Sequence, residues 1–339
     1  MKFFVGIDLH GSNNVVVIRD ETGHNHLKKR LKNELELVLN QLAPFKEQIV
    51  AIAIESTYNW YWLVDGLMDH GYPVKLANPA KIQQYNGIKH TNDMSDAAFL
   101  AELLRLNILP TGYICPKETR HLRDLLRKRL LINRQRVAHI LSFQGTLQRN
   151  LPAFMKAQEI KKLEEGDLDG MFDNVHLSLS AKKSIAIIQF LSKELKEMEQ
   201  VINQSTGKID IHRDLLTVTG IGKTLAASIT LETADISRFP AVGKYTSYCR
   251  LVNSNRISNG KKKGENNRKN GNKYLSWAYT EVAQFSRQWC PQAKRFYQRK
   301  LAKTNKMVAQ RALAHKMARA CYYVMKDHVP YDPVRAFGH

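Results

Sequence analysis

Residues 3–18 read FFVGIDLHGSNNVVVI, and this stretch indicates how the fold begins. Two β-rich runs, Phe3 to Leu9 and Asn14 to Ile18, flank a short polar turn, and the turn signal DETG at residues 20–23 precedes a third run near His24 to Leu31. Short β-rich runs that are separated only by turns pair with their neighbours. We therefore predict a three-stranded meander at the start of the chain.

The order of the elements after this meander predicts the fold class. Helical periodicity begins at Leu35 and ends at Pro44, and Ile49 to Ile54 is a continuous apolar run, which is typical of a strand buried on both faces. The order β-β-β-α-β-α-β-α is that of an α/β RNase H-like fold. The remaining elements that we expect are a helix from Trp60 to His70, a strand from Pro73 to Ala77, and a helix from Asp96 to Leu106 with Ser95 as its N-cap.

Four carboxylates lie where these elements begin or end: Asp8, Glu55, Asp93 and Asp96. Asp8 and Glu55 follow apolar runs, where a buried carboxylate without a cation or partner is costly. Taken alone, Asp96 could favour a helix N-terminus and Asp93 could be a solvated turn residue. Gathered at one place, such carboxylates hold divalent cations about 4 Å apart and so promote phosphodiester cleavage. The sequence therefore predicts a metal-dependent site.

The charge is distributed unevenly along the chain. The formal net charge is +21, yet residues 1–110 carry 11 Lys/Arg against 12 Asp/Glu, whereas residues 171–339 carry 29 against 12. This division indicates that the near-neutral N-terminal part carries the chemistry and that the basic C-terminal part binds a polyanion. We expect this polyanion to be nucleic acid. No apolar run reaches about 18 residues and we find no signal peptide, so we expect a cytoplasmic protein with no membrane partner.

Length and composition also bound the architecture. A chain of 339 residues with 43% hydrophobic residues is expected to form two or three domains with substantial cores. The four cysteines include no CxxC pair, which indicates neither a zinc site nor a disulfide framework. We expect reduced and mostly buried thiols at Cys115, Cys249, Cys290 and Cys321.

A helical arm follows the α/β part. Residues 117–150 are predicted to form one long helix, and Ile188 begins a second apolar seam with heptad spacing. Two such helices joined by a loop over residues 151–180 form either an antiparallel coiled-coil arm or dimer contact, or a hairpin that packs on its own domain. The stripe of the first helix consists of Leu122, Leu126, Leu130, Val137 and Leu141, and the seam of the second of Ile188, Leu191, Leu195, Met198 and Ile202.

The C-terminal part combines a glycine turn with basic segments. Residues 219–223 read TGIGK between two helical segments, a pattern typical of the helix-hairpin-helix device that holds a phosphate on backbone N–H groups, although it also occurs as a plain tight turn. Residues 250–273 are predicted to be a basic loop, and helix is expected to resume from Tyr274 to Asp327. Its aromatic residues fit a core better than base stacking: Trp277, Tyr279, Phe285, Trp289, Phe296 and Tyr297.

Several motifs together resemble one known family. GIDLH at residues 6–10, AIES at 53–56, Asn78-Pro79 and TNDMSDA at 91–97 resemble the DEDD transposases of bacterial insertion sequences, the family of the Piv and MooV invertases. In the C-terminal half, TGIGKTLAA at 219–227, RLVNSNRISNG at 250–260 and KNGNKYL at 269–275 look like that family's transposase-specific domain. The motifs follow the family's order over essentially the whole chain.

This resemblance implies a domain plan and a metal. The plan is a RuvC-like catalytic domain over residues 1–112, a coiled-coil helical arm over 113–208, and a transposase domain over 209–330 that contains the helix-hairpin-helix and the nucleophile loop. In such a protein the carboxylates Asp8, Glu55, Asp93 and Asp96 bind Mg²⁺, with Mn²⁺ as a substitute. The implied activity is DNA transposition by strand transfer.

The resemblance also implies a nucleophile and partners. Ser258 would attack DNA and form a covalent 5′-phosphoserine, although this chain has Ser258-Asn259-Gly260 where better-known relatives have Ser-Gly. The implied partners are double-stranded DNA of the element ends and target, a noncoding bridge RNA and further copies of the chain in a dimer or tetramer, at the bacterial nucleoid. We expect nucleic-acid contacts at Gly220, Gly222, Lys223, Arg250, Arg256, Lys261, Lys262, Lys263, Arg268 and Lys269.

Three other functions remain as alternatives. A RuvC-like nuclease or Holliday-junction resolvase would use water as its nucleophile, and it leaves Ser258 without a chemical role. An actin-like sugar kinase or ATPase is suggested by GIDLHGSNNVVVI at residues 6–18, but it requires a second phosphate loop that we do not find in the sequence. A nucleic-acid chaperone acting by charge alone would not need Asp8.

Overall fold

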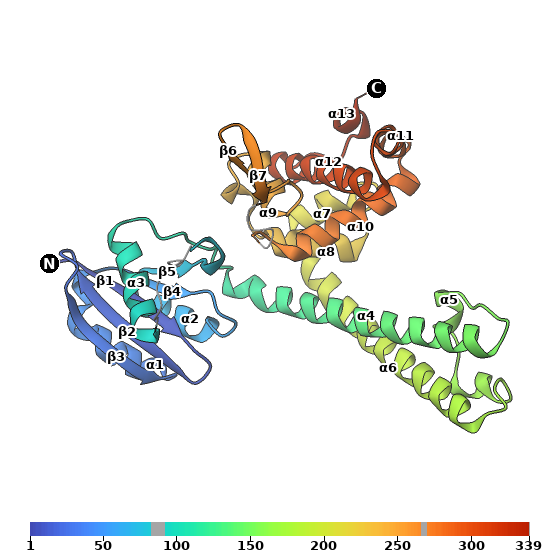
Figure 1. Ribbon diagram of the computed structural model, residues 1–339, viewed down its shortest axis with the longest axis horizontal. Coiled ribbons are helices and arrows are strands. Elements are labelled where there is room, and N and C mark those ends of the chain that lie inside the picture. Colours follow the sequence, from blue (N-terminus) through green and yellow to red (C-terminus); the bar gives the residue numbers. More distant parts are fainter. Residues whose placement is uncertain (83–91, 266–269, 339) are drawn as a thin grey trace. The chain divides into compact units, whose positions relative to one another are not determined.

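The computed structural model describes residues 1–82, 92–265 and 270–338. The chain divides into two compact units, Met1–Lys117 and Glu118–His339. The elements of both units are labelled in Figure 1.

The first unit is built on a mixed five-stranded sheet with the order β3-β2-β1-β4-β5. β1, β2 and β3 are antiparallel neighbours, which confirms the predicted meander, and β4 and β5 continue the sheet parallel to β1. This α/β arrangement is consistent with a RuvC-like domain. The strands are β1 (Phe3–Leu9), β2 (Asn13–Asp20), β3 (Asn25–Lys32), β4 (Ile49–Glu55) and β5 (Val74–Ala77).

Helices cover both faces of this sheet. The core under α1 (Leu35–Leu42) and α2 (Tyr61–Asp69) includes Ile7 and Ile52, whereas α3 (Asp93–Arg105) packs on the other face against Val15 and Val17. Alternate residues of a strand point to opposite faces. This explains the continuous apolar runs in the sequence, because both faces are buried. Two short 3₁₀ helices, Ala43–Gln48 and Pro79–Lys81, complete the described part of the unit.

Helix α3 begins earlier than predicted. Its N-cap is Asn92 rather than Ser95, because the Asn92 side chain accepts a hydrogen bond from the Ser95 N–H and the Ser95 hydroxyl accepts one from the Asn92 N–H, each at 2.9 Å. This reciprocal capping box satisfies two backbone donors that would otherwise lack partners. Asp93 and Asp96 consequently both lie in the first turn of the helix.

In the second unit, α4 (Lys117–Asn150) and α6 (Val175–Thr206) are the two long helices of the predicted arm. The seam of α6 is confirmed at Ile188, Leu195 and Ile202, which are all buried. The stripe of α4 is correct up to Leu130 and wrong beyond it, because a repeat of four residues drifts around a helix with 3.6 residues per turn. Val137 and Leu141 are exposed, and the residues buried instead are Ile140, Phe143 and Leu147.

The connection between these helices is more regular than the predicted loop. It contains α5 (Ala157–Ile160) and a 3₁₀ turn, Glu165–Leu168, and α6 already begins at Val175 with Asn174 as its N-cap. Ile160 and Leu168 are fully buried against the facing ends of α4 and α6. The tip of the arm therefore has a small apolar core of its own.

The rest of the second unit is a helical domain with one β-hairpin. The predicted continuous helix from Tyr274 to Asp327 is three helices, because Pro291 cannot continue the hydrogen-bond ladder and Asn305 caps a new helix. The aromatic prediction holds for Tyr279 and Tyr297, which are buried. It is wrong for Phe285 and Trp289, which are exposed because they face away from the core. The elements are α7 (Asp210–Leu216), α8 (Lys223–Thr233), a 3₁₀ turn (Ile236–Arg238), α9 (Val242–Tyr248), β6 (Asn255–Ser258), β7 (Lys261–Glu265), α10 (Lys273–Trp289), α11 (Pro291–Leu301), α12 (Lys306–Asp327) and α13 (Pro333–Phe337).

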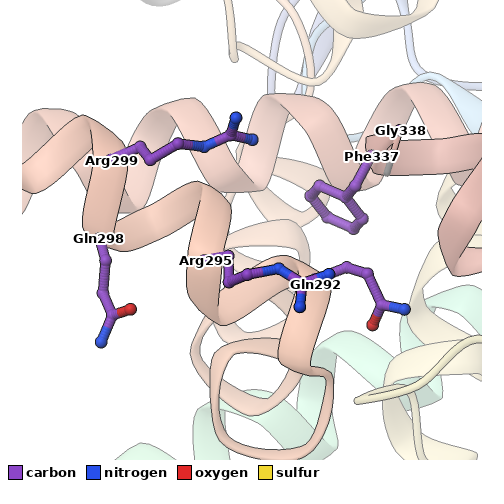
Figure 2. A pocket seen from close by; sticks show the side chains of 6 residues that line it. All are labelled: Gln292, Arg295, Gln298, Arg299, Phe337 and Gly338. Atoms are coloured by element: carbon purple, nitrogen blue, oxygen red, sulfur yellow. The ribbon is translucent and has the colours of Figure 1, made fainter.

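A small hollow of about 250 Å³ lies between α11 and the end of α13. Phe337 and the guanidinium groups of Arg295 and Arg299 line it together with two glutamines (Figure 2). Its guanidinium groups add to the positive charge of this unit.

The expectations for the cysteines and for membrane-spanning segments can be compared with the structure. All four cysteine side chains are buried, as predicted. In the described part of the chain, each helix is either too short or too polar to span a bilayer.

Candidate active site

The register of the sheet places a row of functional side chains on the face that α3 covers. Asp8 in β1 lies opposite Val15 in β2, which in turn lies opposite Arg30 in β3. Glu55 follows Ile54, the partner of Ile7, so it stands beside Asp8 in the neighbouring parallel strand. Residues directly opposite one another in a ladder point to the same face. Strand pairing alone thus directs the side chains of Asp8, Glu55 and Arg30 to one side of the sheet.

Helix α3 brings the other two carboxylates to this row. Asp93 and Asp96 occupy its first turn, and the helix packs closely on β1 and β2 through Ala97, which is fully buried. A helix N-terminus also favours nearby negative charge. The structure therefore gathers all four sequence-predicted acids at one place, where two strand ends meet a helix start.

The mutual effects of these acids show how close they lie. Burial raises the pKa of Asp8, Glu55 and Asp96, and repulsion from neighbouring carboxylates raises each of them further. The interacting pairs link Asp8 with Glu55, Asp93 and Asp96, and link Asp96 with both Glu55 and Asp93. Burial and mutual repulsion disfavour the ionised form of these carboxyl groups. A bound cation would stabilise that form.

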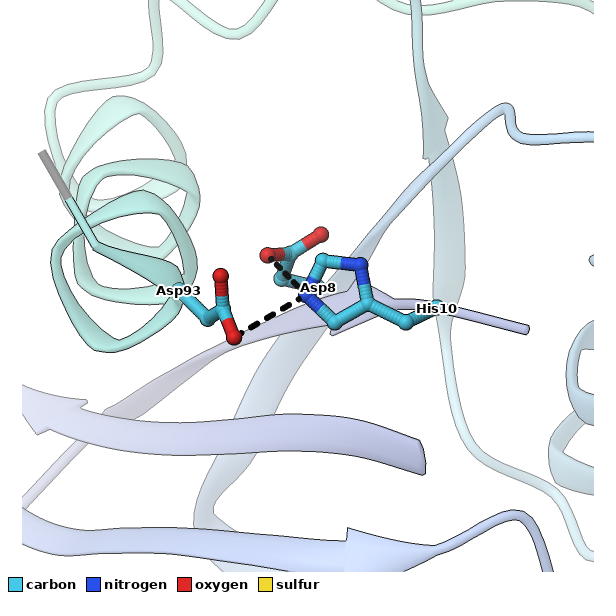
Figure 3. Close-up of side chains that lie close together, drawn as sticks. All are labelled: Asp8, His10 and Asp93. Carbon is cyan, nitrogen blue, oxygen red and sulfur yellow. Dashed lines mark ion pairs between the residues drawn. The ribbon is translucent and has the colours of Figure 1, made fainter. Parts of the chain in front are cut away.

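Two nitrogen-bearing side chains, Arg30 and His10, contact Asp93, and sequence reasoning missed both as site residues. Arg30 donates a hydrogen bond from its terminal nitrogen to Asp93 Oδ2 at 2.6 Å, which is the main reason that the pKa of Asp93 is lowered. Nε2 of His10 lies 3.3 Å from the same oxygen and 3.2 Å from Asp8 Oδ2 (Figure 3). His10 stands in the GIDLH motif, and Arg30 in the basic run at residues 28–32, so signals for both existed.

The predicted nucleophile lies in the second unit, on a hairpin rather than in the predicted loop. Ser258 is the last residue of β6, and Asn259 and Gly260 form the turn with φ angles of 50° and 69°. Asn-Gly is the preferred pair for such a left-handed two-residue turn. Ser258, Asn259 and Gly260 are all exposed, as is every residue of β7. The serine hydroxyl is therefore accessible.

The basic residues predicted around this serine have different environments. Lys261, Lys262 and Lys263 are exposed on β7. Arg250 donates from Nε to the Gly271 carbonyl oxygen at 2.9 Å, so its guanidinium ties the two ends of the hairpin segment together. Arg256 belongs to β6, whereas Arg268 and Lys269 lie outside the described residues.

A buried network of ionic and hydrogen-bonded side chains lies where the hairpin segment joins α10. Sequence reasoning did not predict this network. Glu232 in α8 is 3% exposed and accepts two hydrogen bonds from Arg127 in α4, at 2.6 and 2.8 Å, and a third from the Asn272 side chain at 2.6 Å. The side-chain oxygen of Asn272 caps α10. Because a buried carboxylate without its donors is costly, this network fixes the first turn of α10, directly after the hairpin segment.

The glycine turn joins α7 to α8. Gly220 has φ 95°, and a Cβ there would lie 2.6 Å from the backbone nitrogen of Ser286, so only glycine fits. Gly222 is the N-cap of α8 and has no side chain, so in the described part of the chain no side chain of the cap residue accepts from the first backbone N–H groups of this helix. A hollow of about 590 Å³ beside the turn is also lined by the exposed rings of Phe285 and Trp289.

Comparison with known families agrees with this arrangement. A transposase family model for the DEDD transposases of the IS110 type matches residues 5–152, which include the whole acid cluster. A second model, described as transposase IS116/IS110/IS902 family, matches residues 212–298, which include the glycine turn and the Ser258 hairpin. No curated protein matches the chain.

The fold, the acid cluster and these matches define a DNA transposase/recombinase. More specifically, the chain belongs to the IS110 family of DEDD insertion-sequence transposases. A transposase acts on DNA, and the DEDD type indicates a divalent metal ion.

Proposed function

We propose that this transposase cuts and rejoins DNA with divalent metal, Mg²⁺ in the first instance, held by Asp8, Glu55, Asp93 and Asp96, and with Ser258 as its nucleophile. The observation that carries the metal proposal is the convergence of these four carboxylates from β1, β4 and α3. Carboxylate oxygens are the ligands that Mg²⁺ prefers, and Asp8 is 5% exposed, which fits a cation-binding role. We further propose that this domain is RuvC-like.

The chemistry divides between the two units. Metal ions at such a site stabilise the attacking and leaving oxygens of a phosphodiester. Ser258 Oγ forms a bond to phosphorus while the bond to the 3′ oxygen breaks, so the DNA keeps a 3′ hydroxyl and the protein carries the 5′ phosphate. A general base takes up the serine proton, and a proton is returned to the departing 3′ oxygen. Exposed Lys261 to Lys263 offset the negative charge of the reacting phosphate.

The remaining surfaces support binding of nucleic acid. We assign the turn at Gly220 and Gly222 to a helix-hairpin-helix contact with a DNA phosphate, since the first turn of α8 presents backbone N–H groups beside Lys223. A bridge RNA is proposed as the guide that selects donor and target DNA. The support for it is the family resemblance together with the excess of basic residues in the second unit, whose charge suits any nucleic acid.

The arm supports the proposal of a dimer or tetramer. Leu141 on α4 and Leu179 and Phe190 on α6 are each more than half exposed, at 61, 55 and 61%. Leu179 and Phe190 are eleven residues apart on α6 and so share one face of that helix, and large apolar side chains exposed on one face mark interaction sites. We infer that this face of the arm packs against another copy of the chain.

One experiment distinguishes this function from that of a RuvC-like nuclease. The wild-type protein is assembled with nicked or gapped element-end DNA and the guide RNA, the reaction is stopped with denaturant, and the products are analysed by mass spectrometry. We expect a peptide containing Ser258 that is joined to a 5′ phosphate. Ser258→Ala should abolish the adduct without preventing complex assembly, and Asp8→Asn or Glu55→Gln should abolish cleavage while binding persists.

Two results would contradict the proposal. An adduct on another residue, such as Ser254, would show that the nucleophile is assigned wrongly. Cleavage that leaves free 5′ phosphate ends and no adduct would favour a nuclease that uses water. Normal cleavage by both Asp8→Asn and Glu55→Gln would overturn the metal site.

A further inference from the structure

His10 occupies an unusual position at the centre of the acid cluster. Its Nε2 atom is buried and forms no well-directed hydrogen bond in the described part of the structure, although it contacts Asp8 Oδ2 and Asp93 Oδ2 at 3.2 and 3.3 Å. Figure 3 shows the ring pointing between the two carboxylates. A buried polar nitrogen without a well-directed hydrogen bond needs another partner.

These separations match those of neighbouring metal ligands. In an octahedral site with metal–ligand distances of about 2.0–2.1 Å, adjacent donor atoms lie about 3 Å apart. One donor atom each from Asp8, His10 and Asp93 lies within 4.8 Å of the other two. The three side chains therefore bring one nitrogen and two carboxylate oxygens within reach of one metal ion.

The backbone of His10 is held in place, which limits how far its ring can withdraw. Its N–H donates to the Asn13 carbonyl oxygen at 2.9 Å, and its own carbonyl oxygen accepts from the side chains of Asn33 and Asn59, each at 2.9 Å. Asn33 follows β3 and Asn59 follows β4, so the loop after β1 is tied to both sides of the sheet. Preorganised ligands bind metal more tightly than mobile ones.

We infer that His10 is an additional protein ligand of the metal site and biases it toward divalent transition-metal ions such as Mn²⁺. This inference rests on the proposed carboxylate site. Mg²⁺ is bound almost entirely by oxygen ligands, whereas imidazole nitrogen binds divalent transition-metal ions, most strongly the later ones and least strongly Mn²⁺. Removing the imidazole should therefore weaken Mn²⁺ binding more than Mg²⁺ binding.

The test measures metal binding by the full-length protein without DNA. Mn²⁺ is titrated and followed by electron paramagnetic resonance, and pulsed measurements detect coupling of the bound ion to ¹⁴N. We expect ¹⁴N coupling in the wild type, its loss in His10→Gln, and an affinity for Mn²⁺ that falls about tenfold or more. Competition with Mg²⁺ should show a smaller loss, of no more than about threefold. His24→Gln, an exposed histidine substitution in the same unit, should behave like the wild type.

The outcomes separate this inference from the proposed function. Mn²⁺ binding that depends on Asp8 but shows no ¹⁴N coupling, or coupling that survives in His10→Gln, would overturn the role of His10 alone. Tighter Mn²⁺ binding by His10→Gln would also overturn it, because His10 would then act as a cation that competes with the metal. No Mn²⁺ binding by a folded wild-type protein, verified by circular dichroism, would overturn the carboxylate site as well.

Discussion

Gly6 in β1 lies directly beneath the Ala97 carbonyl of α3: a Cβ added to Gly6 would come within 2.0 Å of that oxygen, and within 2.7 Å of the Ala101 nitrogen. Both neighbours are backbone atoms of a helix, so neither can rotate away. The missing side chain lets α3 lie close to the sheet, and Asp93 and Asp96 reach Asp8 for this reason.

We expect Gly6→Ala to push α3 away from β1. The substitution should destabilise the first unit by about 1–3 kcal/mol and weaken metal binding, because the distance between Asp8 and the α3 acids grows. Calorimetric unfolding and Mn²⁺ titration measure the two effects. Gly112→Ala is the matched control, since its added Cβ meets only ordinary contacts at 3.7 and 3.9 Å. Unchanged metal affinity in Gly6→Ala would show that the acids do not depend on this close approach.

The exposed apolar face of α6 should decide the oligomeric state. Leu179 and Phe190 are eleven residues apart, which is about three helical turns, so they share one face of α6. The double substitution Leu179→Glu and Phe190→Glu should shift the protein toward monomer in sedimentation-velocity experiments. Ser180→Glu adds charge at an exposed neighbouring position and should leave the mass unchanged. If the double variant keeps the wild-type mass, the subunit contact lies elsewhere.

The lysines of β7 should contribute to binding through their charge. Replacing Lys261, Lys262 and Lys263 with serine is expected to weaken binding to duplex DNA and to flatten the log–log salt dependence by up to about 0.9 per lost phosphate contact. Fluorescence anisotropy over a range of salt concentrations measures the slope. The triple arginine variant conserves the charge and should keep the wild-type slope. An unchanged slope in the serine variant would show that these lysines face solvent in the complex.

Glu102 should make the folding stability of the first unit fall as the pH is lowered below about 4.5. The pKa of Glu102 is lowered from 4.5 to about 2, chiefly by a hydrogen bond from Arg105; burial opposes this shift, and a hydrogen bond from Arg19 adds to it. A carboxylate whose pKa is lower in the folded state stabilises the protein above its unfolded pKa, and this contribution is lost as the pH falls from about 4.5 toward 2. The contribution is about 1 kcal/mol, because the pair is partly exposed and screened.

The measurement for Glu102 is the unfolding midpoint of the first unit between pH 6 and pH 2.5. Glu102→Gln should lower stability at pH 6 and flatten the decline below pH 4.5. Glu47→Gln, at an exposed position of the same unit, should leave the decline as steep as in the wild type. A Glu102→Gln variant that declines as steeply as the wild type would assign the acid sensitivity to other carboxylates.

Much of the first unit follows from local patterns. The strand and helix order was predictable because runs such as Ile49 to Ile54 have a length and composition that suit only a buried strand, and because turns follow them. The four acids were predictable as a group because each stands at the end or beginning of such an element. In the arm, the seam from Ile188 to Ile202 was predictable for the same reason, since helical periodicity is a local property.

Other features depend on contacts between distant parts of the chain. Arg30 reaches the site only because the ladder sets it across two strands from Asp8, and Glu232 meets Arg127, which is 105 residues away in sequence. The basic run at residues 28–32 marks Arg30 as a candidate but does not say which carboxylate it meets, and Glu232 and Arg127 have no local signal, because surface charges and buried ion pairs have the same residue types. Val137 and Leu141 were expected inside and are exposed, since the drift of the stripe depends on which helix packs alongside.

The sequence by itself thus determined the elements and the identity of the acids, because secondary structure and element ends are set by neighbours along the chain. Tertiary structure decided which nitrogen and oxygen atoms lie together as candidate metal ligands. The position of His10 between Asp8 and Asp93 depends on strand register, on the close packing of α3 over Gly6, and on the amides of Asn33 and Asn59. These are interactions across space, and no periodicity along the chain records them.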